Sequence, residues 1–270
     1  MYPFLKKVVT SKDDLFEIVQ EVRNYKWQTI EPWSSEWYRG QGRNDWKLVP
    51  NITRKLQYPI QAEQVEKELV KDFNLELANN GLSKLIQEGF LNSKFHTDWL
   101  LLQQAQHYRV PTRFMDWTTK WEVALFFTVS NILDDKYDGQ FWIYNLQSSK
   151  LTSEQSKFEH LNLDPYKFNT IIFLNSSGNL SDGYLSKIAE RRKTIQNGRF
   201  CIQPYNKIFT PLEEQEEHSS NLTKIIIPKE LKAKMRDELK EDGYTDEYLF
   251  VKEDDIIKEI VEDLKVKYKV

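Results

Sequence analysis

Side chains that can bind a ligand or carry a proton are concentrated between Gln104 and Phe127, in the sequence QAQHYRVPTRFMDWTTKWEVALFF. The polar and ionisable ones lie close together: Gln106, His107, Arg113, Asp116, Thr118 and Thr119. Buried polar groups cost roughly 1–3 kcal/mol when they lack a partner. Such a group around Trp117, beside a strongly apolar helix, therefore predicts a site.

A second candidate is Arg39 in the sequence WYRGQGRNDWK, where a strand-like run meets two glycines. Its planar guanidinium suits a phosphate, with the backbone N–H groups of Gly40–Gly42 and the side chain of Gln41 beside it. Arg54 and Arg113 offer further cations. The alternatives are structural: Arg39 forms an ion pair with Asp116 or another buried carboxylate, or Arg113 and Asp116 form a local salt bridge three residues apart.

Gln196 is the third candidate, in the sequence Gln196-Asn197-Gly198 before a strand-like run. Asn-Gly readily adopts positive φ, so the segment is typical of a turn. The functional alternative places the Gln196 amide at a strand edge facing a cleft. The basic cluster from Lys187 to Lys193 is interpreted as a solvated helix face.

Several site classes are excluded by spacing. The two glycines at 40 and 42 lack the third glycine of a dinucleotide-binding fingerprint, and there is no Walker A sequence. The four histidines show no metal-ligand spacing, so we expect no metal site. Cys201 lies in an apolar run and is expected to be an inert thiol.

Composition places few further limits on function. A net charge of −3 gives no footprint for nonspecific duplex binding, although a nucleic-acid or protein acceptor stays open. One cysteine indicates a reducing compartment. The first residues lack the long apolar run and small-residue cleavage site of a signal peptide, and no stretch approaches the roughly 18 apolar residues of a membrane span. We therefore expect a cytoplasmic protein that does not contact membranes. The acidic run at 213–217 is expected to be a solvated loop.

The elements that position these residues are predicted from periodicity. Helices are expected over 11–26, 61–78 and 98–108, and from a Thr119–Glu122 capping box onward, which places Asp116 just before a helix. Short strands are expected over 37–40, 140–144, 170–174, 199–202 and 224–227. Helices and short strands without regular alternation indicate an α+β fold with short mixed or antiparallel strands.

Four segments together resemble the FRG domain family. AQHYRVPTRFMDWTTKWEVALFF is similar to its AQHY-x-x-PTR-x-x-DWT element, and WYRGQGRNDWKLVPNITRK to its arginine-glycine-glutamine element. RRKTIQNGRFCIQP resembles its glutamine-x-glycine-x-phenylalanine element, and IIIPKELKAKMRDELKEDGYTDEYLF its closing helix. The matches run in order from about residue 11 to 250, with a helical extension over 251–270. The resemblance implies one FRG-type domain over 1–270, and the family carries no established chemistry.

The order of the three polar segments also resembles the plan of ADP-ribosyltransferases. By that analogy the core is ADP-ribosyltransferase-like, NAD is the cofactor or substrate, and Arg39 holds its phosphate or ribose. Asp116, Trp117 and Thr118 line the nicotinamide side, and Gln196 takes the place of a catalytic glutamate. Gln41, Arg54, Gln106, His107 and Arg113 complete the ligand-binding set. Two alternatives are a noncatalytic nucleotide or nucleic-acid sensor of a bacterial defence or mobile-element system, and a protein-interaction scaffold.

Overall fold

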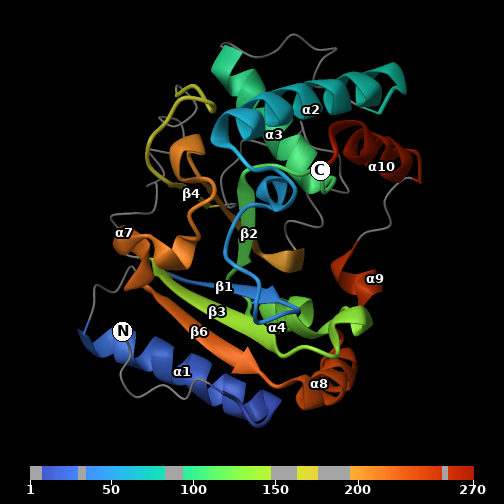
Figure 1. Ribbon diagram of the computed structural model, residues 1–270. Coiled ribbons are helices and arrows are strands. Elements are labelled where there is room, and N and C mark those ends of the chain that lie inside the picture. The colour runs from blue at the N-terminus through green and yellow to red at the C-terminus, as the bar shows by residue number, and fades with distance from the viewer. Residues whose placement is uncertain (1–7, 30–34, 83–93, 147–162, 176–194, 251–254) are drawn as a thin grey trace.

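A computed structural model describes residues 8–29, 35–82, 94–146, 163–175, 195–250 and 255–270 (Figure 1). The basic cluster at 187–193 lies outside these residues. The described α-helices are α1 (Lys12–Thr29), α2 (Pro59–Asn79), α3 (Lys94–His107), α4 (Trp121–Val129), α7 (Glu216–Ser219), α8 (Lys229–Glu241), α9 (Asp246–Leu249) and α10 (Asp255–Tyr268). Short 3₁₀ turns include η1 (Asn51–Arg54), η2 (Ile132–Asp134), η5 (Tyr205–Lys207) and η6 (Leu212–Glu214).

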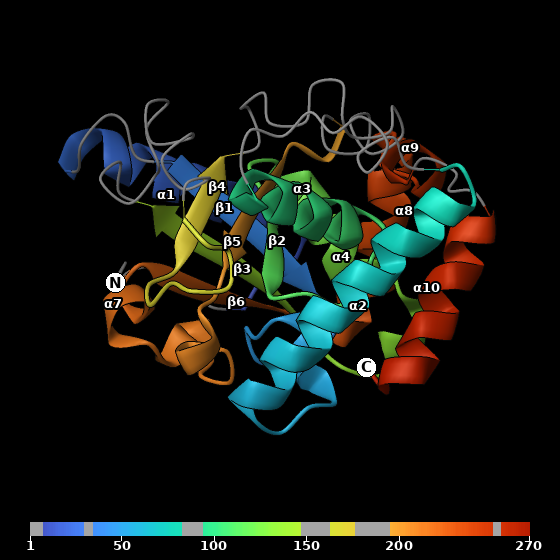
Figure 2. The same ribbon diagram turned by 90° about the horizontal axis from the view of Figure 1, so that it is seen from above.

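The strands form one six-stranded antiparallel sheet in the order β4-β5-β2-β1-β3-β6. They are β1 (Ser35–Gln41), β2 (Phe114–Thr118), β3 (Gly139–Leu146), β4 (Ile172–Asn175), β5 (Gly198–Ile202) and β6 (Leu222–Ile227). Helices at both ends of the sheet complete an α+β fold, as predicted (Figures 1 and 2).

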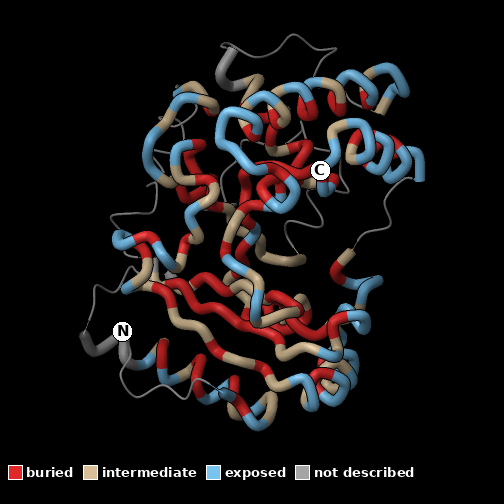
Figure 3. The backbone as a smooth tube through the Cα atoms, in the orientation of Figure 1, coloured by how far each residue is buried: buried red, intermediate tan, exposed pale blue. Residues whose placement is uncertain are grey.

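Three apolar clusters hold the layers together, and buried segments follow the sheet while the outer helix faces are exposed (Figure 3). The first cluster joins α2, α3 and α10 to the β2–β5 half of the sheet. The second packs α1, α4 and α8 on the β1–β3–β6 half. The third lies among the tryptophans and tyrosine of the strands, including Trp37, Trp117, Trp142 and Tyr144. The half of the sheet that the first cluster covers meets the half that the second covers between β2 and β1.

Gly40 allows α4 to lie directly on β1 at that junction. A Cβ atom at this position would lie 1.8 Å from the carbonyl oxygen of Ala124 and 2.4 Å from Oγ1 of Thr128. Backbone cannot move aside as a flexible side chain can, so only glycine fits here. The glycine predicted to bind phosphate instead packs a helix, and its strand pairs with β3 through Gly40 opposite Phe141.

Three local predictions differ from the structure. Residues 114–118 form strand β2, so Asp116 lies inside a strand and not in a turn before a helix. The Thr119 capping box is wrong: α4 begins at Trp121, and Thr119 Oγ1 instead accepts a hydrogen bond from Asn197. The acidic run is not a free loop, since it folds into η6 and α7 and buries His218.

None of the helices in the described residues is long and apolar enough to cross a membrane.

Candidate functional site

The sheet opens between its two central strands. β1 pairs with β3 along its whole length, but within the described strands it pairs with β2 only where Tyr38 faces Thr118. Beyond this pair the two strands diverge, and the backbone carbonyl of Asp116 is left without a strand partner on that side. Backbone polar groups away from water need a partner. The Arg39 guanidinium supplies it, because Nη1 donates to the Asp116 carbonyl.

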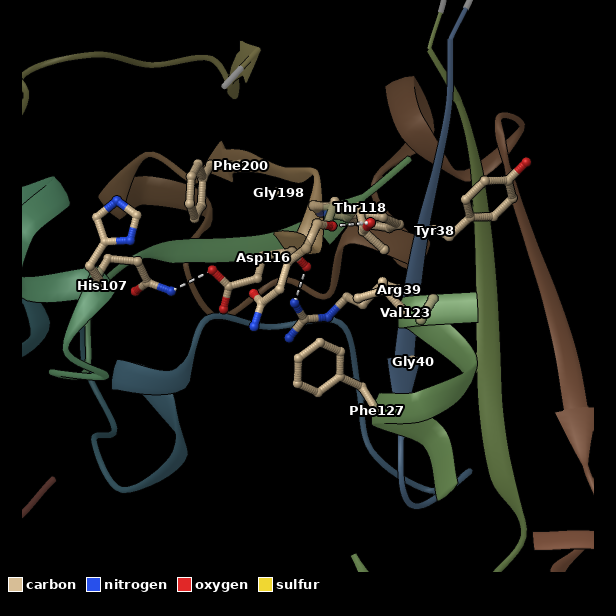
Figure 4. Close-up of a pocket in the computed structure, with 14 residues that line it drawn as sticks. Tyr38, Arg39, Gly40, His107, Asp116, Thr118, Val123, Phe127, Gly198 and Phe200 are labelled. Atoms are coloured by element: carbon tan, nitrogen blue, oxygen red, sulfur yellow. Dashed lines mark hydrogen bonds between the residues drawn. The ribbon is translucent and has the colours of Figure 1, made fainter. Parts of the chain in front are cut away.

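A cavity of about 160 Å³ lies at this opening. Its walls come from β1, β2, β5, α3 and α4, which meet at the junction of the two halves of the sheet. Seven of the predicted residues line it: Arg39, Gln106, His107, Asp116, Trp117, Thr118 and Gln196. Figure 4 shows the side chains of Arg39 and Asp116 near one another, with Tyr38 pointing away from them.

Arg39 forms no salt bridge in the described part of the chain, although the charge of Asp116 acts on it. Its Nε atom is buried and makes no hydrogen bond, and Nη1 binds only a backbone carbonyl. Burial lowers the pKa of Arg39 and the charge of Asp116 opposes that change, although a guanidinium stays protonated in proteins. The alternative of a structural ion pair is therefore not found among the described residues, and the guanidinium keeps donor capacity for an anion.

The Asp116 carboxylate is held by a chain of hydrogen bonds. Oδ1 accepts from Gln106 Nε2 at 2.8 Å, and Gln106 Oε1 accepts from Thr112 Oγ1 at 2.5 Å. The Phe114 N–H donates to Thr112 Oγ1 at 3.2 Å, which completes the chain. Since the Thr112 hydroxyl fixes the direction of the Gln106 amide, the NH₂ group faces Asp116. Asp116 is the one exposed residue of β2, and its side chain faces the cavity.

Two aromatic rings border the charged groups. Phe127 on α4 and Phe200 on β5 line the cavity, and His107 lies edge-on to Phe200 at 6.0 Å between ring centroids (Figure 4). Both phenylalanines were missed as site residues. Phe200 could have been found, because it is the phenylalanine of the glutamine-x-glycine-x-phenylalanine element. Phe127 carries no signal that distinguishes it from the apolar core of its helix.

Other lining residues already use their polar groups. The Thr118 hydroxyl donates to the Gln196 carbonyl at 2.6 Å and accepts from the Lys120 N–H at 3.0 Å. The Gln196 amide donates to the Leu249 carbonyl at 3.0 Å. Trp117 is buried, with its indole N–H 3.3 Å from Cys201 Sγ in the third cluster. These residues shape the wall more than they offer groups to a ligand. The turn predicted at Gln196–Gly198 is present, since Asn197 has φ 46°.

Three predicted ligand-binding residues do not line the cavity. Gln41 is buried, and its Oε1 accepts from Gln140 Nε2 at 2.7 Å. Gln140 also donates to the carbonyls of Arg43 and Trp46, so Gln41 stabilises the loop that follows β1. Arg54 lies outside the lining, with its guanidinium carbon 4.8 Å from the centroid of the Trp46 ring.

Arg113 is the third, and it is fully buried away from the cavity. Its Nε donates to Glu66 Oε2 at 2.6 Å, and its Nη atoms donate to the carbonyls of Gln203 and Pro165. The Tyr205 ring stacks on the guanidinium at 3.7 Å and the Tyr205 hydroxyl donates to Glu66 at 2.6 Å. The local salt bridge to Asp116 is therefore wrong, and the donors of Arg113 are already used by other groups. Glu66, 47 residues earlier on α2, is the true partner.

The described residues contain no group of three or more histidine, cysteine, aspartate or glutamate side chains that could hold a metal ion. The cavity wall carries one guanidinium, one oriented carboxylate, an imidazole and the rings of Phe127 and Phe200. This combination suits an anionic ligand with hydroxyl groups and a flat ring.

Comparison with known proteins identifies one family. Residues 34–137 match the model of the FRG domain, so the chain contains an FRG domain over this stretch and the resemblance seen in its motifs is confirmed there. The match includes β1, β2, α3 and α4 and ends before β5. Neither the curated proteins nor the solved structures contain a match to this chain.

Proposed function

We propose that this FRG-domain protein binds a nucleotide-type ligand in the cavity between β1 and β2. One observation carries the proposal: Arg39 and Asp116 share a cavity, and neither side chain neutralises the other. A site with both a free guanidinium and an oriented carboxylate favours a ligand that has an anionic group beside neutral hydroxyls. A nucleotide has both, in its phosphate and its ribose.

Arg39 is proposed to bind the phosphate or the adjoining ribose. Its buried Nε lacks a hydrogen-bond acceptor, and a buried donor without an acceptor is unfavourable by roughly 1–3 kcal/mol. A phosphate oxygen would accept this bond and supply the missing negative charge. A charge-assisted bond of this kind is about twice as strong as a neutral one.

Asp116 is proposed to accept hydrogen bonds from the ribose hydroxyls. The Gln106 amide occupies Oδ1, which leaves Oδ2 without a partner among the described residues. An amide in its place could still accept from the Gln106 NH₂ group through its one oxygen, but it would present an NH₂ donor where Oδ2 offers an acceptor. Phe127 and Phe200 supply apolar faces for the base or nicotinamide ring. The cavity of about 160 Å³ is smaller than the roughly 300–1,000 Å³ pockets that enclose drug-sized ligands, so it would enclose about one ring of the ligand and leave the rest at its opening.

Cleavage of NAD is a second candidate, favoured by the position of Asp116. Breaking the bond between nicotinamide N1 and ribose C1′ sends the electron pair to nicotinamide and leaves positive charge on the ribose. A fixed carboxylate stabilises that charge. Water or an acceptor then bonds to C1′ and releases a proton. Gln196 contributes less, because its amide is neutral and donates to Leu249. NAD hydrolysis and ADP-ribosyl transfer therefore both depend on Asp116 in this proposal.

We also propose that residues 1–270 act as one FRG-type unit. The matched segment supplies only the two central strands, β1 and β2, while β3, β4, β5 and β6 come from later in the chain. Gln196, Gly198 and Phe200 of the cavity wall come from that later part. A nucleotide sensor in a defence or mobile-element system, with a nucleic-acid or protein partner, would use the same cavity without cleavage.

One experiment separates cleavage from binding. Purified protein is incubated with NAD labelled in the nicotinamide ring, and released nicotinamide is measured beside the melting temperature with NAD or ADP-ribose. Release that is lost in Asp116→Asn supports cleavage, and a raised melting temperature without release supports a binding module. Lys258→Gln is the control, because its exposed pair with Asp255 lies on α10. The proposal is overturned if no nicotinamide is released and the melting temperature does not change with NAD or ADP-ribose.

A further inference from the structure

Two consecutive residues late in the chain, Leu249 and Phe250, contact residues of the cavity wall. The Leu249 carbonyl accepts the hydrogen bond of 3.0 Å from the Gln196 amide. The ring centroids of Phe250 and Phe127 are 5.8 Å apart, with an angle of 70° between the ring planes. Gln196 and Phe127 both line the cavity, whereas Leu249 and Phe250 do not (Figure 4). Both late residues therefore act on the wall and not on a ligand.

Phe250 completes a group of three aromatic rings with two residues of α4. Phe126 and Phe127 are 5.8 Å apart between ring centroids, with an interplanar angle of 83°. Phe126 and Phe250 are 6.1 Å apart, with an angle of 58°. Phe126 is buried in the second cluster, and edge-on contacts of this kind are favourable for aromatic rings. The Phe127 ring, which borders the cavity, is therefore packed against two other rings.

The Phe250 ring also contacts the turn that ends α3. The guanidinium carbon of Arg109 lies 4.6 Å from the Phe250 ring centroid. Arg109 has φ 62°, a left-handed conformation that is unfavourable for most residues other than glycine. Its N–H donates to the Gln106 carbonyl at 3.0 Å, so this turn directly follows the two lining residues Gln106 and His107. The attraction between the cation and the ring offsets part of the backbone strain.

The position of Leu249 and Phe250 is fixed by α9. Leu249 is fully buried in the second cluster, and its N–H donates to the Thr245 carbonyl at 2.9 Å. The Phe250 N–H donates to the Asp246 carbonyl at 2.7 Å. Thr245 caps the helix, because its Oγ1 accepts from the Tyr248 N–H at 3.2 Å. The ring of Phe250 is thus presented to α4 from a short, capped helix.

We propose that Phe250 is a positioning residue that orients the Phe127 ring toward the ligand bound in the cavity. This inference rests on the proposed function, in which Phe127 supplies an apolar face for a ring of the ligand. A ring that is already restricted by its neighbours loses less conformational entropy when a ligand packs on it. Phe250 lies outside the matched stretch 34–137, so the aromatic wall of the cavity depends on a later part of the chain.

The test is a double-mutant cycle on ADP-ribose binding, measured by calorimetry. We expect Phe250→Ala to weaken ADP-ribose roughly 3- to 10-fold, the effect of one aromatic contact. Phe127→Ala should weaken it at least as much. In the Phe127→Ala background, Phe250→Ala should change the affinity by no more than about 2-fold, because the ring through which it acts is absent.

Three further variants separate positioning from stability. Phe16→Ala is the matched control: Phe16 lies 5.8 Å from Trp121, which begins α4 but does not line the cavity. It removes an aromatic contact from the same helix and should leave ADP-ribose affinity within about 2-fold. Phe250→Tyr keeps the ring and should bind as the wild type does. Phe250→Leu keeps the apolar contact that supports folding but lacks the ring, so it should bind as weakly as Phe250→Ala.

The inference and the proposed function fail in different ways. Wild-type affinity in Phe250→Ala and Phe250→Leu, or in Phe127→Ala, would overturn the positioning role while the proposed function stands. Equal losses in Phe250→Ala and Phe16→Ala would do the same, as would a full loss from Phe250→Ala in the Phe127→Ala background. Absence of ADP-ribose binding in the wild-type protein overturns the proposed function, and the positioning role with it.

Discussion

Glu66→Gln is expected to destabilise the protein strongly, although the residue lies outside the cavity. The Glu66 carboxylate accepts three hydrogen bonds of 2.6 Å, from the Arg113 N–H, from Arg113 Nε and from the Tyr205 hydroxyl. The side chains of Glu66 and Arg113 are 0% and 1% exposed. Glutamine has almost the same shape but places an NH₂ group against these donors and leaves the arginine charge without a partner.

The magnitude follows from burial. Breaking a buried ion pair by removing one charge costs about 3–5 kcal/mol, because the other charge is left uncompensated. For a chain of this size, each kcal/mol lowers the melting temperature by roughly 2–4 °C. We therefore expect a loss of roughly 6–20 °C in Glu66→Gln. The double variant Glu66→Met with Arg113→Met should be less destabilised than either single variant, since it removes both charges.

Urea unfolding followed by tryptophan fluorescence measures the loss, with Glu63→Gln as the matched control. Glu63 lies one turn earlier on α2 and pairs with Lys67 at 2.6 Å, but this pair is half-exposed. Exposed pairs contribute about 0–1 kcal/mol. Equal losses in Glu66→Gln and Glu63→Gln would refute the reasoning. Lost ligand binding in Arg113→Met with an unchanged unfolding midpoint would return Arg113 to the ligand site.

Three further outcomes are expected. Thr112→Val removes the hydroxyl that directs the Gln106 amide toward Asp116, so the affinity for ADP-ribose measured by calorimetry should fall. Thr112→Ser keeps a hydroxyl and should recover the affinity. Equal affinities in the two variants would contradict the role of the hydrogen-bond chain. Burial raises the pKa of the Cys201 thiol to about 12, so a disulfide reagent at pH 8 should label it only after unfolding. Because the unfolded thiol loses its proton from about pH 8.5 and the folded thiol does not, the free energy of unfolding should fall as the pH rises from about 8.5 toward 12. Gly40→Ala should lower the free energy of unfolding by about 1–3 kcal/mol or more, and with it the urea midpoint, because the new Cβ meets a backbone carbonyl of α4. An unchanged midpoint would contradict that packing.

The α+β class and most element positions could be predicted because they depend on local periodicity. The strand at 114–118 could not, because a polar Asp116 interrupts its apolar residues at the position that faces the cavity. The Thr119 capping box is a local pattern as well. It failed because tertiary contacts took priority, and Thr119 accepts a hydrogen bond from Asn197 instead.

Much of the candidate site follows from its motifs, but the separation of structural from cavity-lining arginines does not. Arg39 and Arg113 carry the same side chain beside similar polar residues. Arg113 is buried because it pairs with Glu66, which is distant in sequence. Arg39 lines the cavity because β1 separates from β2 beyond the Tyr38–Thr118 pair. Gln41 accepts a hydrogen bond from its cross-strand neighbour Gln140 and therefore does not line the cavity. The register of β1 on β3 places these two residues opposite each other.

The affinity of Arg39→Gln for ADP-ribose tests the central claim most directly. The claim is that the Arg39 guanidinium, whose Nε has no acceptor, and the Asp116 carboxylate bind one ligand together. Calorimetry should give a loss of at least roughly 10-fold in Arg39→Gln, the effect of one charge-assisted bond, and a similar loss in Asp116→Asn, with melting temperatures of the free proteins within a few degrees of wild type. Wild-type affinity in both variants would contradict the account.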